Sequence, residues 1–282
     1  MKKSILSAAL AASLVSTSAL ADVKFYGSAE QAISITDGVA KIVGGSNDLG
    51  VMATEDLGNG LTAIANFELR NYTDEDYIWK NRKAYVGFTN GSSTLMLGKA
   101  ENVEKVMLEG DMDIFQGSTS LTLEGADRPS NGVVFLTNLG AVELGASAVM
   151  DGADGEEVAD SHELGAKINL GSVTLGGVYS KNTADGTDAI SAVATLKLND
   201  VNFSAAYQPD ASAGKTYSAL TQVKMDANKL RVGVESVTDG DVTYIAELEH
   251  NFSKKTRVYL QYAGTDADDA EPTTEIGMRV KF

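Results

Sequence analysis

Segments in which apolar and polar residues alternate recur along almost the whole chain. This two-residue period is typical of β-strands that have one apolar and one polar face. The only helix-period stretch of useful length is Val103–Leu108. The pattern therefore predicts an all-β fold, with clear examples at Leu61–Arg70, Glu163–Ile168, Val201–Gln208, Leu230–Glu235 and Arg257–Tyr262.

Two kinds of connection alternate between these predicted strands. Short ones, rich in Asn, Asp and Gly, suit tight hairpins because these residues tolerate positive φ; they fall at residues 57–60, 90–92, 138–140, 169–171, 199–200, 226–228 and 253–255. Longer and mostly acidic ones fall at residues 36–48, 72–76, 101–129, 151–160, 181–188, 209–215, 238–241 and 264–272. Seven short and eight long connections imply sixteen strands.

Alternation alone does not separate a soluble sandwich from a transmembrane barrel. Short turns at one end and long loops at the other are typical of outer-membrane barrels. The last strand, Glu275–Phe282, alternates strictly and ends on an aromatic residue. Because no strand edge can stay unpaired in lipid, we expect this strand to pair with the first. The prediction is a transmembrane antiparallel barrel of about sixteen strands, with short periplasmic turns and long extracellular loops.

Residues 1–21 have the features of a secretory signal peptide. Lys2 and Lys3 precede a short apolar stretch, and Ala19-Leu20-Ala21 forms a small-x-small cleavage site. Cleavage would leave one barrel domain, residues 22–282, beginning at Asp22.

Composition narrows the possible partners. The chain has no cysteine and a formal net charge of −16, which becomes more negative once Lys2 and Lys3 are removed. This acidity argues against nucleic acid as a partner and suits a surface or lumen that favours cations. There is no second long apolar run, which excludes a helical membrane protein.

Catalytic signatures are missing from the sequence. The two histidines, His162 and His250, fall by parity on the lipid-facing side, and no Gly-x-Ser-x-Gly motif or zinc-binding histidine pair occurs. Residues 151–157 form an acidic turn without the ligand spacing of a calcium loop. We therefore predict no enzyme activity, no cofactor and no metal site.

Several stretches together resemble the Gram-negative general porins, in the branch that includes neisserial, comamonad and vibrio porins. The opening strand Asp22–Gly27 is similar to that of the family, and Gly50–Ala63 closely resembles its second hairpin. Asn81–Phe88 followed by Leu97–Lys99 resembles the next hairpin. His250–Thr256 and Val280–Phe282 resemble the last turn and the end.

This resemblance implies a sixteen-stranded trimeric diffusion channel whose third loop folds into the lumen as a constriction. The matching segment is the longest connection, residues 101–129, and its acidic residues are Glu101, Glu104, Glu109, Asp111, Asp113, Glu124 and Asp127. The facing wall should be basic. The resemblance in sequence motifs implies that Arg82 and Arg128 belong to this wall, and strand parity alone predicts the same for Lys24 and Arg70.

Arg82 presents a difficulty, because simple alternation puts it on the same face as Val86 and Phe88. Either a β-bulge intervenes or Arg82 lies above the lipid zone. Lys99 presents the same difficulty with Leu95 and Leu97.

The expected function is a general diffusion channel for ions and small hydrophilic solutes in the cell outer membrane, with a weak cation preference because the chain is acidic. Expected partners are two further copies in a homotrimer, outer-membrane lipid and lipopolysaccharide, and the barrel-assembly machinery, which would use the C-terminal strand and Phe282. Two alternatives stay open: an oligosaccharide-selective channel, which needs inward aromatics such as Tyr26 and Tyr259, and a non-conducting structural or adhesive barrel.

Overall fold

The computed structural model describes residues 21–71, 79–121, 123, 125, 127–152, 159–182, 187–210 and 214–282. The predicted signal peptide, apart from Ala21, lies outside the described residues. So do Glu124 and the predicted loop at residues 72–76, together with the central parts of three other predicted loops.

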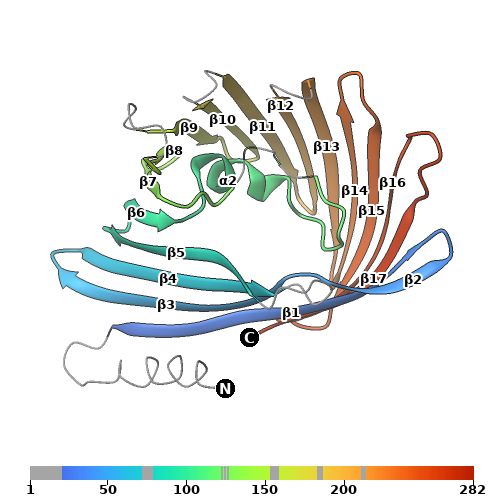
Figure 1. The fold of residues 1–282 in the computed structure, drawn as a ribbon, viewed down its shortest axis with the longest axis horizontal. Helices are drawn as coiled ribbons and strands as arrows, with labels where there is room; N and C mark the ends of the chain where they lie inside the picture. The colour runs from blue at the N-terminus through green and yellow to red at the C-terminus, as the bar shows by residue number, and fades with distance from the viewer. Residues whose placement is uncertain are drawn as a thin grey trace.

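The described chain forms one antiparallel sheet that closes into a barrel (Figure 1). Apart from β2 and β3, which both pair with β1, each strand pairs with its neighbour in sequence, and the last strand returns to the first. The strands are β1 (Asp22–Thr36), β2 (Val39–Gly44), β3 (Asn47–Gly58), β4 (Leu61–Asn71), β5 (Lys80–Thr89), β6 (Ser93–Lys99), β7 (Gly132–Asn138), β8 (Val142–Val149), β9 (Ser161–Asn169), β10 (Val173–Asn182), β11 (Asp188–Leu198), β12 (Val201–Asp210), β13 (Gly214–Met225), β14 (Asn228–Val237), β15 (Val242–Asn251), β16 (Thr256–Thr265) and β17 (Thr273–Lys281).

The prediction that residues 36–48 form a long loop is wrong. Most of this segment is strand β2, which pairs with the far half of β1 from Gln31 to Thr36, while β3 pairs with the near half from Asp22 to Ser28. A tight turn at Asp37 and Gly38, with φ of 49° and 71°, joins β1 to β2. Because β2 and β3 follow each other along the same edge of β1, they act as one interrupted strand, and the barrel has the predicted sixteen.

Closure follows the prediction from the C-terminal alternation. Strands β1 and β17 pair in register from Ser28 opposite Lys281 to Thr36 opposite Thr273. Beyond the strand end, the Gly27 amide donates to the Phe282 carbonyl at 3.2 Å and the Phe282 amide donates back at 3.1 Å. The terminal aromatic residue is thus part of the seam.

Residues that favour positive φ form the short turns. Asn59, Asn199 and Asp226 have φ values of 53°, 51° and 53°, which match the right-handed twist of the flanking strands. These turns lie at one end of the barrel, as predicted, and this end is periplasmic if the barrel has the usual orientation.

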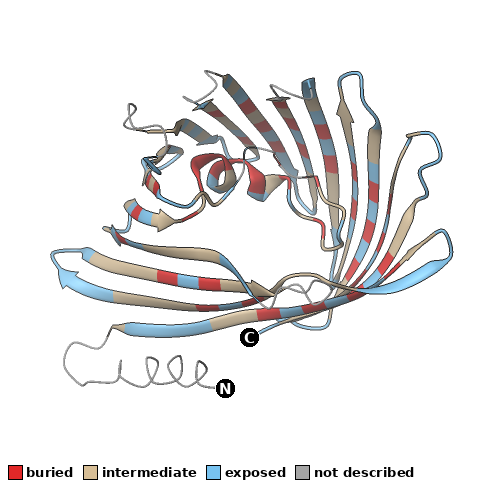
Figure 2. Cartoon of the chain, in the orientation of Figure 1, coloured by how far each residue is buried: buried red, intermediate tan, exposed pale blue. Residues whose placement is uncertain are grey.

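Burial alternates along the strands, as Figure 2 shows. Apolar side chains such as Phe67, Leu164 and Ile276 are exposed on the outside, whereas Glu30, Gln261 and Glu275 on the inside are buried. No helix in the described part of the chain is long and apolar enough to cross a membrane.

The connection between β6 and β7, residues 100–131 (the inner loop), runs inside the barrel (Figure 1). It contains the short helix α2 (Val103–Met107) and the 3-10 turn η1 (Glu109–Asp111). Asn102 caps α2 by accepting a hydrogen bond from the Lys105 amide. An apolar core lies between the inner loop and the wall, and the sequence analysis did not predict it; its members include Val103, Met107, Leu108, Phe115, Leu121, Val134, Val178, Val193, Leu220 and Ile245.

Candidate functional site

Glycines on the inner wall make room for the inner loop. A Cβ on Gly165 of β9 would lie 2.5 Å from Val103 Cγ1 and 2.8 Å from Met107 Sδ. A Cβ on Gly176 of β10 would lie 2.5 Å from Leu108 Cδ2. These positions need glycine because α2 packs directly against the strand backbone.

A wall carboxylate holds the start of α2. Glu163 Oε2 accepts hydrogen bonds from the Val103 amide at 2.8 Å and from Ser147 Oγ at 2.6 Å, while Glu163 Oε1 accepts from Asn102 Nδ2 at 2.6 Å. A carboxylate at the first turn satisfies amides that have no partner within the helix. One wall residue therefore fixes where the inner loop enters the lumen.

Three wall residues, which we call the anchor row, hold the far part of the inner loop. Glu247, Gln261 and Glu275 are direct cross-strand partners on β15, β16 and β17. Their side-chain oxygens accept hydrogen bonds from consecutive loop amides: Gln116 at 2.6 Å and Gly117 at 3.2 Å to Glu247, Ser118 at 2.6 Å to Glu275, and Thr119 at 3.3 Å to Gln261. The inner loop is thus fixed to the wall at its start, residues 102–103, and again at its middle, residues 116–119. This path across the barrel narrows the lumen.

A β-bulge brings Arg82 into the lumen. Strand pairing between β4 and β5 shifts at Glu68 and Leu69, so that Lys83 and Arg82 both face inward. Arg82 forms ion pairs with Glu68 and, at 3.5 Å, with Asp48. The structure thereby resolves the two readings left open for Arg82 in favour of the bulge.

Further basic residues gather around the same part of the wall. Arg70 binds Asp48 through two nitrogens, at 2.6 and 2.8 Å. Arg279 of β17 lies 3.6 Å from Glu30 and close enough to Arg70 and Arg257 to interact with them electrostatically. Together with Arg82 these side chains form what we call the arginine wall: Arg70, Arg82, Arg257 and Arg279.

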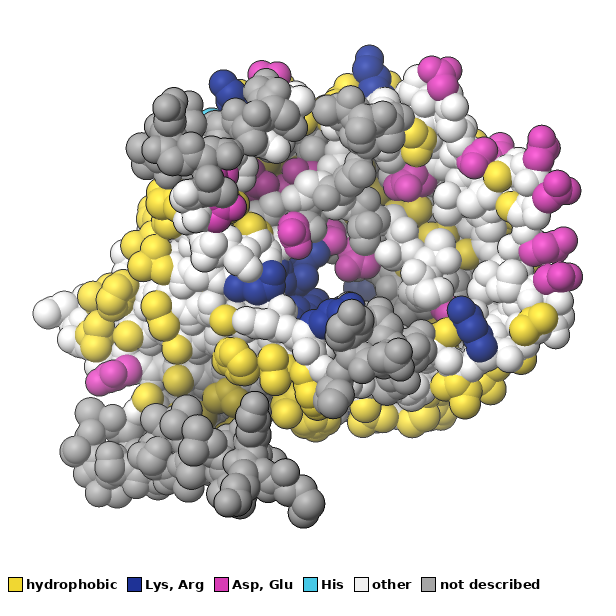
Figure 3. All heavy atoms as spheres, in the orientation of Figure 1, with side chains coloured by type: hydrophobic (Ala, Val, Ile, Leu, Met, Phe, Trp, Pro, Cys, Tyr) yellow, Lys and Arg dark blue, Asp and Glu magenta, His cyan; other side chains and the backbone are white. Residues whose placement is uncertain are grey.

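The carboxylates that neutralise the arginine wall are hidden behind it. The Arg82 side chain is 23% exposed but Glu68 is only 4% exposed, and Arg279 is 19% exposed against 2% for Glu30. Solutes in the lumen therefore meet guanidinium groups first. Figure 3 shows Lys and Arg side chains beside the opening, with Asp and Glu side chains across from them.

The acidic residues predicted for the constriction occupy different environments. Glu101 pairs with Arg128 at 2.6 Å and Lys83 at 3.1 Å. Asp111 pairs with Lys167 at 2.9 Å, and the buried Glu109 pairs with Lys105. Asp113 and Asp127 are exposed.

The Glu104 side chain is directed from the inner loop toward the barrel wall and not toward the lumen surface. It is 1% exposed, and Gln208 Nε2 donates to its Oε1 at 2.9 Å. The sequence pattern gave no sign of this position, because the helix that turns Glu104 toward the wall is only five residues long.

The predicted basic residues also divide into groups. Arg70 and Arg82 belong to the arginine wall, and Arg128 lies at the end of the inner loop on Glu101. Lys24 is exposed on β1, in register with Met52 of β3. Lys99, the second residue in conflict with strand parity, donates to the Arg128 carbonyl at 2.7 Å.

Burial and neighbouring charge shift the pKa values of the inner-loop carboxyls in different directions. Burial opposes ionisation of Glu101, but Lys83 and Arg128 outweigh it and lower its pKa. Burial raises the pKa of Glu104 to about 7, and the nearby carboxyls of Glu163 and Glu109 add to this effect. Burial also raises the pKa of Glu109, in spite of its pairing with Lys105.

Loop docking should therefore weaken above neutral pH. The pKa of Glu104 is higher in the docked loop than the ordinary value of 4.5, so its stabilising effect is complete below about pH 4.5 and is lost as the pH rises through about 7. The corresponding free energy is about 3 kcal/mol. We expect open-channel current noise to be greater at pH 8.5 than at pH 5.5, and the variant Glu104→Gln to remove most of this difference; equal pH dependence in both proteins would contradict the assignment.

Sequence reasoning missed Lys83, Arg257 and Arg279 as members of the basic wall, and missed the whole anchor row. Parity already put Arg257 and Arg279 on the polar face of their strands, which was the available signal. In the described residues, no group of three or more His, Asp or Glu side chains has the geometry to hold a metal ion.

Comparison with known proteins agrees with this architecture. The model of the Gram-negative porin family matches residues 7–270. The major outer membrane protein P.IB of Neisseria meningitidis serogroup B is 32% identical over 119 residues, which cover 37% of this chain. The P.IB protein of Neisseria gonorrhoeae is 33% identical over 112 residues, or 35% of this chain. These alignments span about a third of the length of either relative.

Solved porin structures share the fold. A mutant of the Rh. blastica porin superposes with a TM-score of 0.80 at 14% identity, covering 93% of this chain and 100% of its own. A loop-deletion mutant of OmpT from Vibrio cholerae gives a TM-score of 0.74 at 18% identity, covering 93% of this chain and 99% of its own. The family match over most of the chain, together with the closed barrel, shows that this protein is a member of the Gram-negative porin family, whose proteins reside in the outer membrane.

Proposed function

We propose that the protein is a general diffusion porin, a water-filled channel for ions and small hydrophilic solutes. The observation that carries this proposal is the inner loop, which is anchored to the wall at its start and at its middle and narrows the lumen without filling it (Figure 3). A charged constriction in a wide barrel sets a size limit and an electric field. Neither requires bond chemistry, and the family membership points to a channel rather than an enzyme.

We further propose that the constriction favours small anions. The acidic composition predicts a weak cation preference, but much of the acidic charge of the inner loop is paired locally or buried. The arginine wall, by contrast, is exposed in front of its carboxylate partners. Because selectivity depends on charge at the narrowest point, the arginine wall has more weight than the charge of the outer loops.

The test is a planar bilayer with a salt gradient across the purified protein. Stepwise openings in threes with an anion-selective reversal potential would support a trimeric, anion-favouring porin. A cation-selective reversal potential would contradict the anion proposal and favour the loop carboxylates. An absence of conductance would overturn the channel proposal in favour of a structural or adhesive barrel.

An oligosaccharide-selective channel is less well supported. Of its two candidate aromatics, Tyr26 has its single hydroxyl donor within reach of Asn66 Oδ1 at 2.8 Å and Glu68 Oε2 at 2.9 Å, and Tyr259 is 4% exposed. The Tyr26 ring packs over Gly50 and the Tyr259 ring over Gly277 on the wall. Saturable block of the current by an oligosaccharide would restore this alternative.

Family members are typically trimeric, and we propose a homotrimer here. The outer face of β3–β6 carries an apolar groove lined by small and large side chains, including Ala53, Ala65, Phe67 and Leu97, that a second copy could cover. We also propose lipopolysaccharide as a lipid partner, the seam strand ending at Phe282 as the segment read by the barrel-assembly machinery, and residues 1–21 as the cleaved signal.

A further inference from the structure

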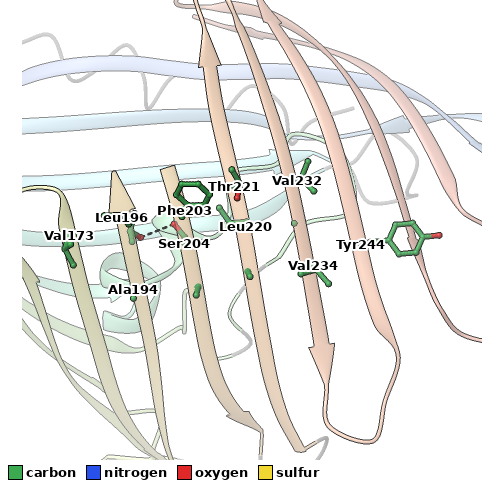
Figure 4. Close-up of a pocket in the computed structure, with 14 residues that line it drawn as sticks. Val173, Ala194, Leu196, Phe203, Ser204, Leu220, Thr221, Val232, Val234 and Tyr244 are labelled. Carbon is green, nitrogen blue, oxygen red and sulfur yellow. Dashed lines mark hydrogen bonds between the residues drawn. The ribbon is translucent and has the colours of Figure 1, made fainter. Parts of the chain in front are cut away.

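A second apolar groove lies on the outer surface, on strands that are remote in sheet order from the proposed trimer face. It spans β10–β15 and has a volume of about 630 Å³ (Figure 4). Its floor is a row of small residues, Ala194, Ala205 and Ala219, which are direct partners across three strands. Larger residues such as Leu196, Phe203 and Val234 border the floor.

The groove continues toward the end of the barrel that carries the long loops. A smaller hollow there is lined by Tyr179, Ile190 and Tyr207. Tyr207 is the next outward residue after Ala205 on β12, so the hollow lies directly beyond the groove along this strand. The Tyr207 ring packs against Tyr217 with centroids 5.4 Å apart. Together they form one track, which we call the outer track, running down the barrel wall.

Two lysines stand at the loop end of the outer track. Lys181 ends the outer face of β10 and Lys215 begins that of β13. These strands are three neighbours apart, so at about 4.8 Å per strand the two strands are separated by about 14 Å. Asp188 is the cross-strand partner of Lys181 on β11, whereas Pro209 is the cross-strand partner of Lys215 on β12. Only Lys181 therefore has a carboxylate as its partner on these strands.

The depth of the outer track matches one leaflet of a bilayer. Ala219 is four residues from Lys215 along β13, about 13 Å at about 3.3 Å per residue. One leaflet contributes about 15 Å of hydrocarbon. A lipid with its headgroup at the lysines would therefore lay its chains in the groove.

We propose that the outer track is a specific site for an outer-leaflet glycolipid that has several acyl chains and two separated phosphates. This proposal rests on the outer-membrane channel function and gives its lipopolysaccharide partner a location. The apolar groove supplies chain packing, and Lys181 and Lys215 supply charge complementarity for the phosphates. A single-phosphate phospholipid would engage one lysine at a time.

The experiment uses the whole protein in detergent and native mass spectrometry with lipid A, a diphosphorylated acylated disaccharide, in competition with phosphatidylglycerol. The double variant Ala205→Phe/Ala219→Phe fills the groove. We expect it to bind lipid A about tenfold more weakly, the loss corresponding to about two buried methylene groups. The matched control is Ala166→Phe, at an exposed outer position of β9 outside the track, and should bind like the wild type.

The lysines are tested separately with Lys181→Gln and Lys215→Gln. Each should reduce the preference for lipid A over phosphatidylglycerol, and Lys215→Gln should have the larger effect. Equal binding by the filled variant and the wild type would overturn the proposal. So would equal competition by phosphatidylglycerol, or cross-linking of groove residues to a second copy.

Channel conductance of the same variants separates the two proposals. The filled variant should conduct normally, because Ala205 and Ala219 face away from the lumen. Wild-type protein that binds lipid A but does not conduct would overturn the proposed function and leave the lipid site standing.

Discussion

Replacing Gly165 by valine should release the inner loop from the wall and raise the single-channel conductance. The new side chain would occupy the space now filled by Val103 and Met107, whose nearest atoms lie 2.5 and 2.8 Å from the Cβ position. Overpacking of this kind costs about 1–3 kcal/mol. The loop can avoid this cost by leaving the wall, and a wider lumen is the result. Planar-bilayer recordings would measure the step size and its noise.

The matched control is Gly177→Val on the neighbouring strand β10. Gly177 faces outward, and the nearest atom to its Cβ position is the Ser191 carbonyl oxygen at 3.8 Å, an ordinary contact. Its conductance should equal that of the wild type. Folding of both variants is checked by heat-dependent gel mobility, because an unfolded barrel would also alter the current. Unchanged conductance in a folded Gly165→Val protein would show that loop packing on the wall does not define the constriction.

Neutralising the arginine wall should have the largest effect on selectivity. The triple variant Arg70→Gln/Arg82→Gln/Arg279→Gln exposes Asp48, Glu68 and Glu30 to the lumen without their partners. A unit charge about 4 Å from a passing ion contributes about 1 kcal/mol in bulk water, which is a factor of about five in local ion concentration for each arginine. The reversal potential in a salt gradient should therefore move strongly toward cation selectivity.

Two further variants separate lumen charge from total charge and from folding. Lys254→Gln changes the charge of an exposed short turn between β15 and β16 and should leave the reversal potential nearly unchanged. The triple Lys variant, Arg70→Lys/Arg82→Lys/Arg279→Lys, keeps the positive charges and should stay close to the wild type. A reversal potential that changes as much with Lys254→Gln as with the triple Gln variant, per charge removed, would refute the role of the arginine wall.

Local features of the sequence determined the strand framework. Alternation predicted the inner and outer faces because the side-chain period of a strand is a property of its own backbone. Asn59, Asn199 and Asp226 marked turns because their residue types tolerate positive φ. The alternating end at Glu275–Phe282 predicted the seam because an unpaired edge is not tolerated in lipid.

The tertiary structure decided which charges meet. The inward position of Arg82 depends on a bulge between β4 and β5. The alternation within β5 does not reveal this bulge, because a bulge is a shift in the register between two strands. Glu104 and Asp113 looked equivalent in the sequence, yet one is buried against Gln208 and the other is exposed. Their difference depends on how the inner loop packs on glycines far away in the chain.

The apolar core inside the barrel also combines a local sequence pattern with contacts that only the tertiary structure shows. Val178, Val193 and Leu220 break the polar pattern of the inner face, but a single apolar residue in a strand does not say what covers it. The inner loop covers these residues because Glu163 and the anchor row fix its path. The sequence by itself thus determined that a barrel forms and where it turns. Contacts between distant segments decided the shape and charge of the opening, because that opening is bounded by side chains from both the wall and the loop.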